Sequence, residues 1–536
     1  MKKIKSVISI IVAVIMLVGV IPLVSACNKD TIDKDLVPTE KVVYYSEYGA
    51  VGDGKTDDFQ AIYDAHKDAN EKGIAVAADR GKTYYIGGAD EWEKQNEYIH
   101  RKSIIVKTNT YWQDAKFIID DRDITDGRVF YKPIFLISSD IPAQQVELDE
   151  DYTLSVGATN VNLTFVSPML LHIENANKKD FIRSGVDQNN GYARQEIILV
   201  DENGNIDKTT PLTWDYTEVT SMRAISTTDK PITISGGKFT TIANNRATDY
   251  FWRNIQVSRS NTTVKKVYHD WEYKELKDSR RAAYAGFLSA RETTNVIFED
   301  CKVTGIDISG AYELDAKLAN NVLWKNVSQT NEFKGNGIFG SNYCRNLRLE
   351  GCKLNRFDAH MGVYNATLTN STIGGGGISV VGFGTLLIDN VTRIALAEKE
   401  TEGSGSRFVY LRGDYGAFWD GEIIIKNSHF TTNGEFPYII YAGWEDWDYG
   451  YPCPLPNLTV ENFVTEYTGT FQQKYQDKSV YYLVINRYMS CEIETIQNSK
   501  NPVEAPEYVH LKNVSPTYRL SNNNKGFYDN TEFINE

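Results

Sequence analysis

The stretch Val296-Ile-Phe-Glu-Asp-Cys-Lys-Val303 carries the pattern that decides the fold. Apolar and polar residues alternate along it, and this is the period of a β-strand whose two faces meet different surroundings. We therefore expect Val296 and Phe298 to point into a core and Ile297 to point out. A bend is expected at Asp300, after which the inward set resumes.

The same phrase recurs through the C-terminal two-thirds of the chain as apolar-x-apolar-polar-Asn-small-x-apolar. Its fifth position falls at Asp300, Asn326, Gly351, Asn370, Asn390, Asn427, Asn462 and Asn513. Asn and Gly suit a bend because both tolerate left-handed backbone angles. The short intervals indicate single coils, and the long ones indicate either coils with loop insertions or two coils.

One such strand pair cannot bury its apolar face alone, whereas stacked coils bury a continuous core. The repeat therefore predicts an all-β fold, a right-handed parallel β-helix, over residues 41–536. A β-sandwich is the weaker alternative, because it would not require the same phrase to recur. Residues 140–222 lack the phrase and contain hairpin signals such as Asp201-Glu-Asn-Gly-Asn205, so we expect a β-rich insertion or arm there.

Upstream of the repeat, Gly52-Asp-Gly-Lys-Thr-Asp-Asp58 precedes apolar residues at helical spacing. Asp57 with Gln60 predicts the start of a helix, and Gly73 predicts its end. We interpret the carboxylates as a structural turn and helix cap in preference to a metal site.

Turn, helix and repeat together resemble the pectate-lyase-like β-helix superfamily, with a pectate-lyase-3-type N-terminus. In that superfamily a GDG-x-x-DD turn feeds a helix that caps the open end of the solenoid. The resemblance covers most of residues 41–536 and implies a carbohydrate-active role. The polygalacturonase motifs and the clustered Asp ligands of calcium-dependent lyases are not recognisable in the coils. The resemblance therefore supports a polysaccharide ligand more than any one reaction.

The N-terminus has the order of an exported lipoprotein. Basic Lys2, Lys3 and Lys5 precede an apolar run over 7–24, and Val24-Ser-Ala-Cys27 follows. This resembles the lipobox of bacterial lipoproteins and predicts a signal peptide over 1–26, lipidation of Cys27, and a tether over 27–40. The expected location is extracytoplasmic, on a membrane, with the lipid as the only anchor. An ordinary signal peptide or a membrane helix is the alternative.

Composition narrows the partners further. The net charge of -14 makes nucleic acid a poor partner. Aromatic residues reach 12% of the chain, which suits both sugar stacking and a β-rich core.

The cysteines beyond Cys27 are odd in number and match no zinc spacing, so we expect buried thiols at Cys301, Cys344, Cys352, Cys453 and Cys491.

The first candidate catalytic cluster is Arg356-Phe-Asp-Ala-His360. In an extended strand Arg356, Asp358 and His360 share the outward face. Asp358 could act as an acid or base or orient His360, and Arg356 could hold a carboxylate. A surface row of ion pairs is the structural alternative.

The second cluster is Tyr410-Leu-Arg-Gly-Asp-Tyr415, in which Tyr410, Arg412 and Asp414 are expected to share one face. It lies two coils downstream, which places Asp414 ~10 Å from Asp358 at ~4.8 Å per strand. That separation resembles the carboxylate gap of inverting glycosidases, ~6.5–9.5 Å. A structural salt bridge between Arg412 and Asp414 is the alternative.

The third cluster is a loop with Trp444, Trp447, Asp448 and Tyr451. Aromatic rings stack on pyranose faces and carboxylates bond hydroxyls, so these residues, with Tyr410, Tyr415 and the weaker candidate Asn342, are expected to bind substrate. The loop could instead pack over the solenoid wall.

These clusters favour a cell-surface enzyme that cleaves a polysaccharide, first a glycoside hydrolase with Asp358 and Asp414 as acid and base, assisted by His360, Arg356 and Arg412. A polysaccharide lyase that performs β-elimination on a uronate is the second hypothesis, with His360 or Tyr410 as base. A non-catalytic glycan-binding or adhesive protein is the third. No cofactor is expected, apart from Ca²⁺ if the protein is a lyase.

Overall fold

The structure is a computed structural model. It describes residues 33–87, 92–95, 98–101, 103–122, 132–185, 187–244, 250–272, 284–305, 312–331, 338–396, 407–434, 437–442, 447–468, 481–482, 484–486, 500, 503–520 and 527–536. Cys27, the signal segment, Trp444 and Cys491 lie outside these residues.

The chain begins with a small cap at one end of the molecule. It consists of η1(Lys34–Leu36), β1(Val42–Tyr44), η2(Tyr45–Tyr48), β2(Asp53–Asp57), α1(Phe59–Lys72), β3(Ala75–Ala77) and β4(Thr83–Ile86). Helix α1 buries Phe59, Ile62 and Ala65 against the open end of the solenoid, as the helical spacing predicted. The Asp57 carboxylate accepts the backbone N–H of Phe59, and Gly73 ends the helix in the left-handed region.

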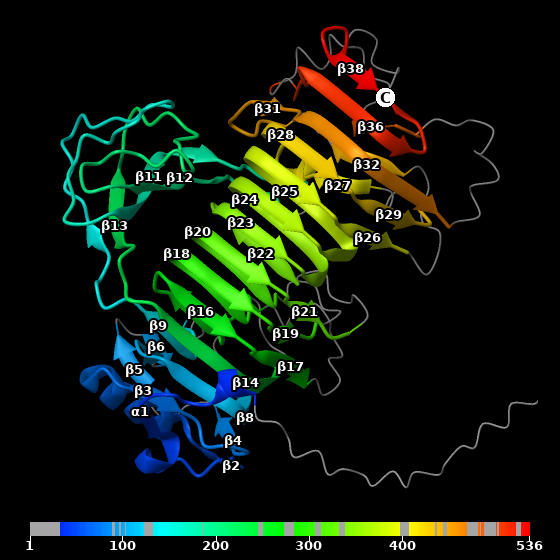
Figure 1. Ribbon diagram of the computed structural model, residues 1–536. Helices are drawn as coiled ribbons and strands as arrows, with labels where there is room; N and C mark the ends of the chain where they lie inside the picture. Colours follow the sequence, from blue (N-terminus) through cyan, green and yellow to red (C-terminus); the bar gives the residue numbers. More distant parts are fainter. Residues whose placement is uncertain are drawn as a thin grey trace, which may run out of the picture.

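The cap is followed by stacked coils of parallel strands (Figure 1). Their strands are β7(Ile104–Val106), β8(Thr110–Asp120), β9(Phe135–Ser138), β14(Ile232–Ile242), β15(Ile255–Ser258), β16(Thr262–Lys265), β17(Tyr268–Glu272), β18(Leu288–Glu299), β19(Lys302–Val303), β20(Leu314–Lys325), β21(Ser328–Gln329), β22(Phe339–Asn342), β23(Arg345–Glu350) and β24(Lys353–Thr369). They continue with β25(Thr372–Asp389), β26(Thr392–Ala395), β27(Arg407–Leu411), η4(Gly413–Tyr415), β28(Trp419–Lys426), β29(His429–Thr432), β30(Tyr438–Ala442), β32(Asn457–Tyr467), β34(Val484–Asn486), β36(Tyr508–Ser515) and β38(Glu532–Asn535).

The remaining short strands form small sheets separate from the large one. They are the antiparallel hairpin β5(Trp92–Gln95) and β6(Tyr98–Arg101), and the parallel pairs β31(Cys453–Pro454) with β35(Val503–Glu504) and β33(Tyr481–Tyr482) with β37(Tyr518–Arg519). Within the described residues no helix is long and apolar enough to cross a bilayer.

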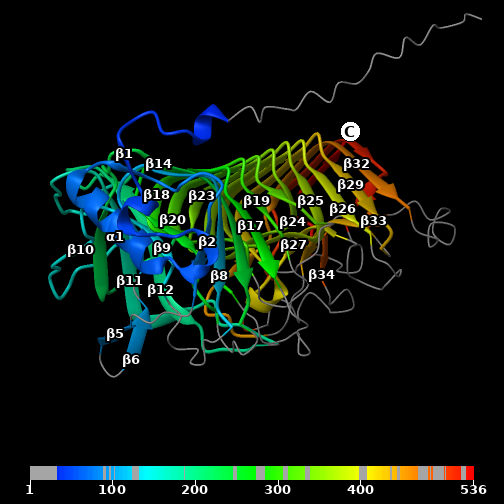
Figure 2. The ribbon, with the colours of Figure 1, turned by 90° about the horizontal axis from the view of Figure 1, so that it is seen from below.

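The coils form the predicted parallel β-helix, and its strands fall into three faces. Face A contains β15, β22, β27, β30 and the segments of β18, β20, β24 and β25 that pair with them. Face B contains the repeat phrase, where Val296 pairs with Val322 and Leu347 with Ala366. Face C contains β17, β19, β21, β26 and β29. Figure 2, turned by 90°, shows the coils stacked side by side.

The core runs through the middle of the coils. Val296 and Phe298 are fully buried while Ile297 is partly exposed, so the predicted alternation is confirmed. Phe298, Trp324, Phe339 and Phe357 follow one another with ring centroids 4.8–5.8 Å apart. Cys301 belongs to the same core, and burial raises the pKa of its thiol to about 12. The cysteines in the described part of the chain, Cys301, Cys344, Cys352 and Cys453, are free and buried.

The bends of the repeat have the conformation that the sequence predicted. All eight fifth positions have φ between 48° and 65°. Their side chains also bond from coil to coil, for example from Asn462 Nδ2 to Asn427 Oδ1 at 3.0 Å and from Asn513 to Asn462 at 3.1 Å. The long intervals are single coils with loop insertions, because the phrase at Ile423 pairs directly with that at Leu458.

An arm interrupts the solenoid between β9 and β14. It is an antiparallel sheet of β10(Gln144–Gln145), β13(Ser221–Ser226), β11(Met169–Asp180) and β12(Tyr192–Val200), with an apolar cluster of its own. It lies beside the coils (Figure 1). Phe181 fixes it there, packing 5.2 Å from the ring of Tyr451 and 6.3 Å from that of Tyr415.

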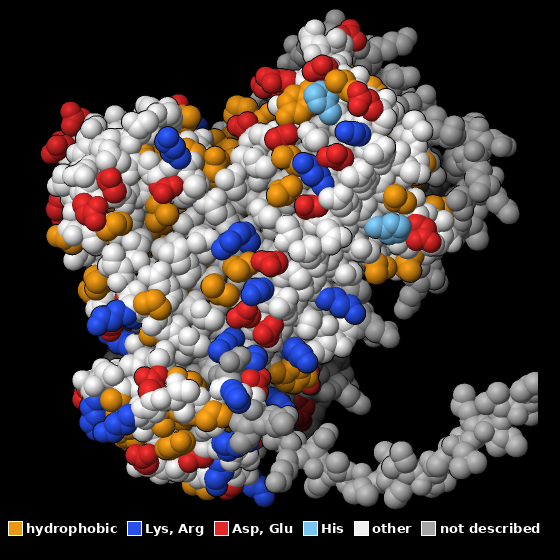
Figure 3. All heavy atoms as spheres, viewed as in Figure 1, with side chains coloured by type: hydrophobic (Ala, Val, Ile, Leu, Met, Phe, Trp, Pro, Cys, Tyr) orange, Lys and Arg blue, Asp and Glu red, His pale blue; other side chains and the backbone are white. Residues whose placement is uncertain are grey.

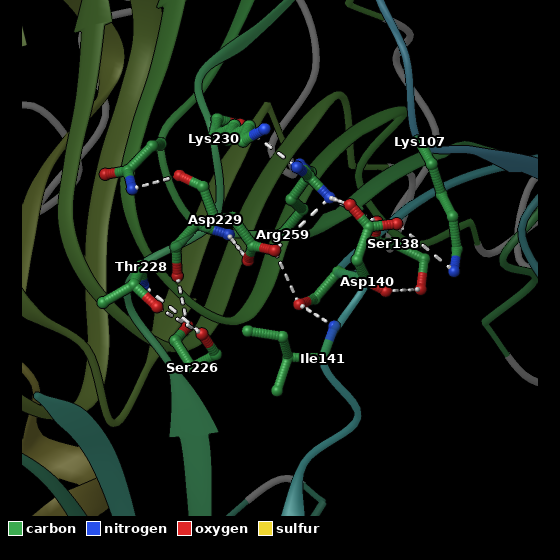
Figure 4. Close-up of polar contacts among 12 residues, drawn as sticks. Lys107, Ser138, Asp140, Ile141, Ser226, Thr228, Asp229, Lys230 and Arg259 are labelled. Atoms are coloured by element: carbon green, nitrogen blue, oxygen red, sulfur yellow. Dashed lines mark hydrogen bonds and ion pairs between the residues drawn. The ribbon is translucent and has the colours of Figure 1, made fainter. Parts of the chain in front are cut away.

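The two chain segments that join the arm to the solenoid are held by one buried arginine, Arg259 (Figure 4). Its Nη1 lies 3.1 Å from Asp140 on the entering segment and 3.3 Å from Asp229 on the leaving segment. Ser139 adds a hydrogen bond to Asp229 at 2.8 Å. Since Arg259 and Asp229 are nearly inaccessible to solvent, this contact sets where the arm leaves the coils.

Candidate functional site

Face A carries a straight row of outward positions that crosses one coil after another. Register places Gln256, Ser289, Asp315, Gly340, Asp358, Ser379, Tyr410 and Tyr441 on it, and we call it the axial row. Inward neighbours such as Phe357, Ala359, Val409 and Leu411 are fully buried in the core. The period of two thus fixes which side chains this face presents.

A pocket of about 250 Å³ opens on face A over β18, β20, β22 and β24. The rings of Tyr250 and Tyr312 form one wall, with centroids 5.8 Å apart. Gly340 makes room for Tyr312, because a Cβ there would lie 2.8 Å from the ring. Rings beside polar groups suit a ligand with both apolar faces and hydroxyls, as a sugar has.

The floor of the pocket carries an ion pair and a second cation. Arg291 Nη2 lies 2.7 Å from Asp315 Oδ2, and its guanidinium packs over Trp252 at 4.4 Å. Lys317 pairs in register with Arg291 and lines the pocket, with no hydrogen bond or ion pair among the described residues. Burial of its amine and the adjacent Arg291 lower the pKa of Lys317. This lysine is therefore a candidate base and a candidate binder of anions.

Asn342 and His360, both predicted from the sequence, line the same pocket. His360 Nδ1 lies 2.8 Å from Asn342 Oδ1, so with the amide oxygen as acceptor Nε2 is the ring nitrogen that can accept a proton. Burial, followed by the effect of Arg412, lowers the pKa of His360 to about 4. The imidazole is therefore neutral at pH 7.

Arg356, Asp358, Arg412 and Asp414 form a continuous chain of ion pairs beside the pocket. Asp358 is bonded by Arg356 Nη2 at 2.7 Å and by Arg412 Nη1 at 3.0 Å. The same Arg412 bonds Asp414 at 2.6 Å through Nη2. Arg183 of the arm extends this chain of ion pairs, since its Nε lies 3.1 Å from Asp414 Oδ2. The two carboxylates are thus brought together across two coils, with Arg412 between them.

The charges of this chain are stabilised by its own members. Burial alone raises the pKa of Asp358, but Arg356, Arg412 and His360 outweigh it and hold the pKa below its usual value. Burial likewise lowers the pKa of Arg412, and Asp358 and Asp414 reverse the effect. Asp358 is thus an ionised, fully paired carboxylate at pH 7.

Two predicted ligand-binding tyrosines are instead structural, which corrects the sequence-based interpretation. Tyr415 is fully buried and Tyr451 is 4% exposed, so neither offers a ring face to a ligand. The Tyr451 hydroxyl donates to the Tyr415 carbonyl at 2.7 Å, and both rings pack under the arm. The sequence could not reveal this because the arm that covers them comes from residues more than two hundred positions earlier.

The other described members of the third cluster, Trp447 and Asp448, do not line the pocket. Trp447 is partly buried and packs against the apolar cluster under the arm. Asp448 is exposed and accepts the backbone N–H of Gly450 at 3.0 Å. Tyr410, by contrast, stands on the axial row and is partly exposed.

Sequence reasoning missed most of the pocket: Tyr250, Trp252, Arg291, Tyr312, Asp315 and Lys317. A signal for three of them was present, because Arg291, Asp315 and Lys317 alternate with apolar residues directly before the repeat phrase. Within the described residues no three His, Cys, Asp or Glu side chains are grouped to hold a metal ion.

Comparisons with known proteins show that this chain is similar in structure to several solved proteins. No family model and no curated sequence matches the chain. The tailspike protein gp49 of Pseudomonas phage LKA1 is 12% identical, with a TM-score of 0.48 over 92% of this chain and 84% of that one. The Gp54 tailspike of Acinetobacter baumannii bacteriophage AP22, solved with a capsular saccharide, is 10% identical, with a TM-score of 0.46 over 92% and 79%. The Streptococcus pneumoniae surface protein and adhesin PfbA is 13% identical, with a TM-score of 0.43 over 92% and 100%.

Proposed function

We propose that this protein is a cell-surface, carbohydrate-active enzyme that binds an acidic polysaccharide along face A and cleaves it by β-elimination. The observation that carries the proposal is the pocket of Tyr250, Trp252, Tyr312, Arg291 and Lys317. It sets the Arg291–Asp315 pair, the cation Lys317 and three aromatic rings in one hollow on a chain whose net charge is -14. An acidic sugar complements both features.

The pocket side chains fit the requirements of an elimination. A base must remove the proton next to the uronate carboxyl group, and a cation must stabilise the charge that develops there. Lys317, with its lowered pKa, and neutral His360 are the candidate bases, and Arg291 is the candidate cation. No metal is needed for this assignment.

Hydrolysis by paired carboxylates, the first hypothesis from the sequence, is supported less well by the geometry. An acid and a base must stand on either side of the scissile bond with room for substrate between them. Arg412 occupies the space between Asp358 and Asp414 and bonds both. Asp358 also has a lowered pKa, whereas a general acid needs a raised one. In this proposal the ion-pair chain of Arg356, Asp358, Arg412 and Asp414 positions the pocket wall and His360.

The test is a digest of acidic and neutral polysaccharides that follows ultraviolet absorbance and reducing ends together. We expect an unsaturated, absorbing product from a uronate polymer. Lys317→Met should lower the rate about 100-fold or more, the range of a general base. Lys325→Met, on the same strand but on face B beside Glu299, is the matched control and should leave the rate unchanged.

Other results would redirect the assignment. Reducing ends without absorbance would favour the hydrolase. Binding without any released sugar would favour the non-catalytic adhesive protein, the remaining alternative. Equal rates for wild type and Lys317→Met would exclude Lys317 as the base.

We also propose that a lipid on Cys27 anchors the protein to the outer side of a membrane. The support is the order of basic residues, apolar run and small residues before Cys27. Labelling with a fatty-acid analogue tests the anchor: wild type should be labelled and retained with membranes, and Cys27→Ser should not.

A further inference from the structure

Four side chains form a second cluster on face A, towards the C-terminal end of the axial row. Arg407 and Tyr410 come from β27, and Tyr438 and Tyr441 come from β30 of the next coil. Register pairs Arg407 with Tyr438 and Tyr410 with Tyr441. Ring centroids are 5.9 Å apart for Tyr410 and Tyr441 and 5.8 Å apart for Tyr438 and Tyr441. We call this the tyrosine–arginine cluster.

Arg407 is held by aromatic rings, and none of the described residues is an acidic partner for it. Its guanidinium carbon lies 3.9 Å from the centroid of Tyr410 and 5.4 Å from that of Tyr441. It makes no ion pair and no hydrogen bond within the described part of the chain. Packing over rings leaves the in-plane N–H groups of a guanidinium available, and these match the oxygens of a carboxylate or sulfate.

A second cation, Arg393 on β26, lies near Arg407. It is 2% exposed, and among the described residues its Nε and Nη1 have no hydrogen-bond partner. Its guanidinium carbon is 5.1 Å from the ring of Phe430, and Gly377 makes room for it, since a Cβ there would lie 2.8 Å from Nη2. Burial, with Arg407 close by, lowers the pKa of Arg393 to about 9.

Two cations that have no acidic partner among the described residues create a local positive potential on an acidic protein. The Arg356–Asp358–Arg412–Asp414 chain does not remove it, because its carboxylates are already paired with Arg356, Arg412 and Arg183. Within the residues that the structure describes, face A therefore presents positive charge here that an anionic ligand would neutralise.

We propose that the tyrosine–arginine cluster is a second glycan subsite, which binds an anionic group, carboxylate or sulfate, on a sugar of the same polysaccharide. It rests on the proposed function in that the glycan lies along face A. Tyr410 stands four strand spacings from Asp315 on the axial row, which is about 19 Å at ~4.8 Å per strand. A ligand that reaches both sites is an extended oligosaccharide parallel to the solenoid axis.

The test is calorimetric titration of the whole chain with carboxymethyl-dextran, dextran sulfate and neutral dextran of matched length. We expect binding of a charged polymer and none of dextran, and the stronger of the two charged polymers identifies the anionic group. Arg407→Gln should weaken binding about tenfold or more, the loss of one charge-assisted contact. Arg407→Lys, which keeps the charge but not the planar fork, should bind with intermediate affinity.

Arg348→Gln, an exposed arginine on face B, is the matched control and should bind as wild type does. Unchanged binding by Arg407→Gln, or binding of neither charged polymer, would overturn the proposal. The outcome is separable from the cleavage test, because Lys317→Met should lower the rate of product formation about 100-fold or more and retain Arg407-dependent binding. Binding that depends on Arg407 with no cleavage by wild type would leave the subsite standing and refute the enzyme.

Discussion

At the scale of single residues, the site consists of charges that are either paired with one another or left for a ligand. Arg412 joins Asp358 and Asp414 and is itself held between them. Lys317 and Arg407, by contrast, point from face A without an acidic partner among the described residues. This division separates groups that shape the wall from groups that can contact substrate.

Replacement of Asp358 by Asn should destabilise the protein. It leaves Arg412 and Arg356 near the core with one compensating charge fewer, and removal of one partner of a buried ion pair costs roughly 3–5 kcal/mol. Chemical denaturation monitored on wild type and variant measures the difference. The exposed substitution Asp448→Asn is the control. A loss below 1 kcal/mol for Asp358→Asn would show that the ion-pair chain is not structural.

His360 should make stability depend on pH in one direction. Its pKa is about 4 in the folded chain against 6.5 as the ordinary value. The unfolded chain therefore takes up a proton first as the pH falls, and the folded state loses stability between pH 6.5 and 4. Relative to His360→Gln, wild type should lose on the order of 1–2 kcal/mol between pH 7.5 and 5. If the free energy of unfolding changed with pH equally in wild type and His360→Gln, the result would contradict the pKa assigned to His360.

The sequence predicted side-chain direction well and side-chain partners poorly. The alternation of side chains along a strand placed Arg356, Asp358 and His360 on one face and Phe357 in the core. The direction of a side chain depends on the local strand alone. The alternation could not predict that Arg412 would bridge two carboxylates or that Tyr451 would be covered. Those facts depend on which coil lies next and on where the arm folds back.

At the scale of elements, the bends are as important as the strands. Asn427 has φ of 48°, which costs most non-glycine residues ~1–2 kcal/mol, and its side chain bonds Asp389 and Asn462 in the adjacent coils. The sequence revealed this row because every repeat carries the same residue type at the same place. A second row, Asn261, Asn295 and Asn321, bonds in the same way without such a phrase.

Asn427→Ala should lower the free energy of unfolding by about 1–2 kcal/mol, since it combines backbone strain with lost hydrogen bonds. Asn427→Gly keeps the backbone angle and should cost less. Denaturant titrations of both variants test the order. A glycine variant less stable than the alanine variant would show that relief of the left-handed angle does not contribute to stability at this bend.

The arm should depend on its buried anchor. Arg259→Met leaves Asp229 buried without its cation, so we expect the segments at 139–141 and 226–230 to open more often. Hydrogen exchange of these segments should rise at least tenfold. Arg80→Gln, which removes a pair that is about half exposed, is the control and should leave exchange unchanged. Equal protection in Arg259→Met would mean that the other contacts of the arm, such as those of Phe181 and Arg183, hold it without Arg259.

At the scale of the whole molecule, charge is distributed differently over the different faces. In the view of Figure 3, basic and acidic side chains alternate along the coils. Lys325 with Glu299 and Lys426 with Glu461 are examples on face B. Face A instead has Arg291 and Lys317 at one end of the axial row and Arg407 at the other, separated by paired charges. The overall charge of -14 therefore does not predict which ligand this face prefers.

The central claim is that face A is the glycan-binding surface, and a crystal structure of the whole chain with an acidic oligosaccharide produced by its own digest tests it most directly. The account predicts sugar density along the axial row, with one ring near Trp252 and Lys317 and an anionic group on Arg407. Density confined to face B, or to the pocket that Leu199 and Asp207 of the arm form with Thr294 and Asn295, would contradict it.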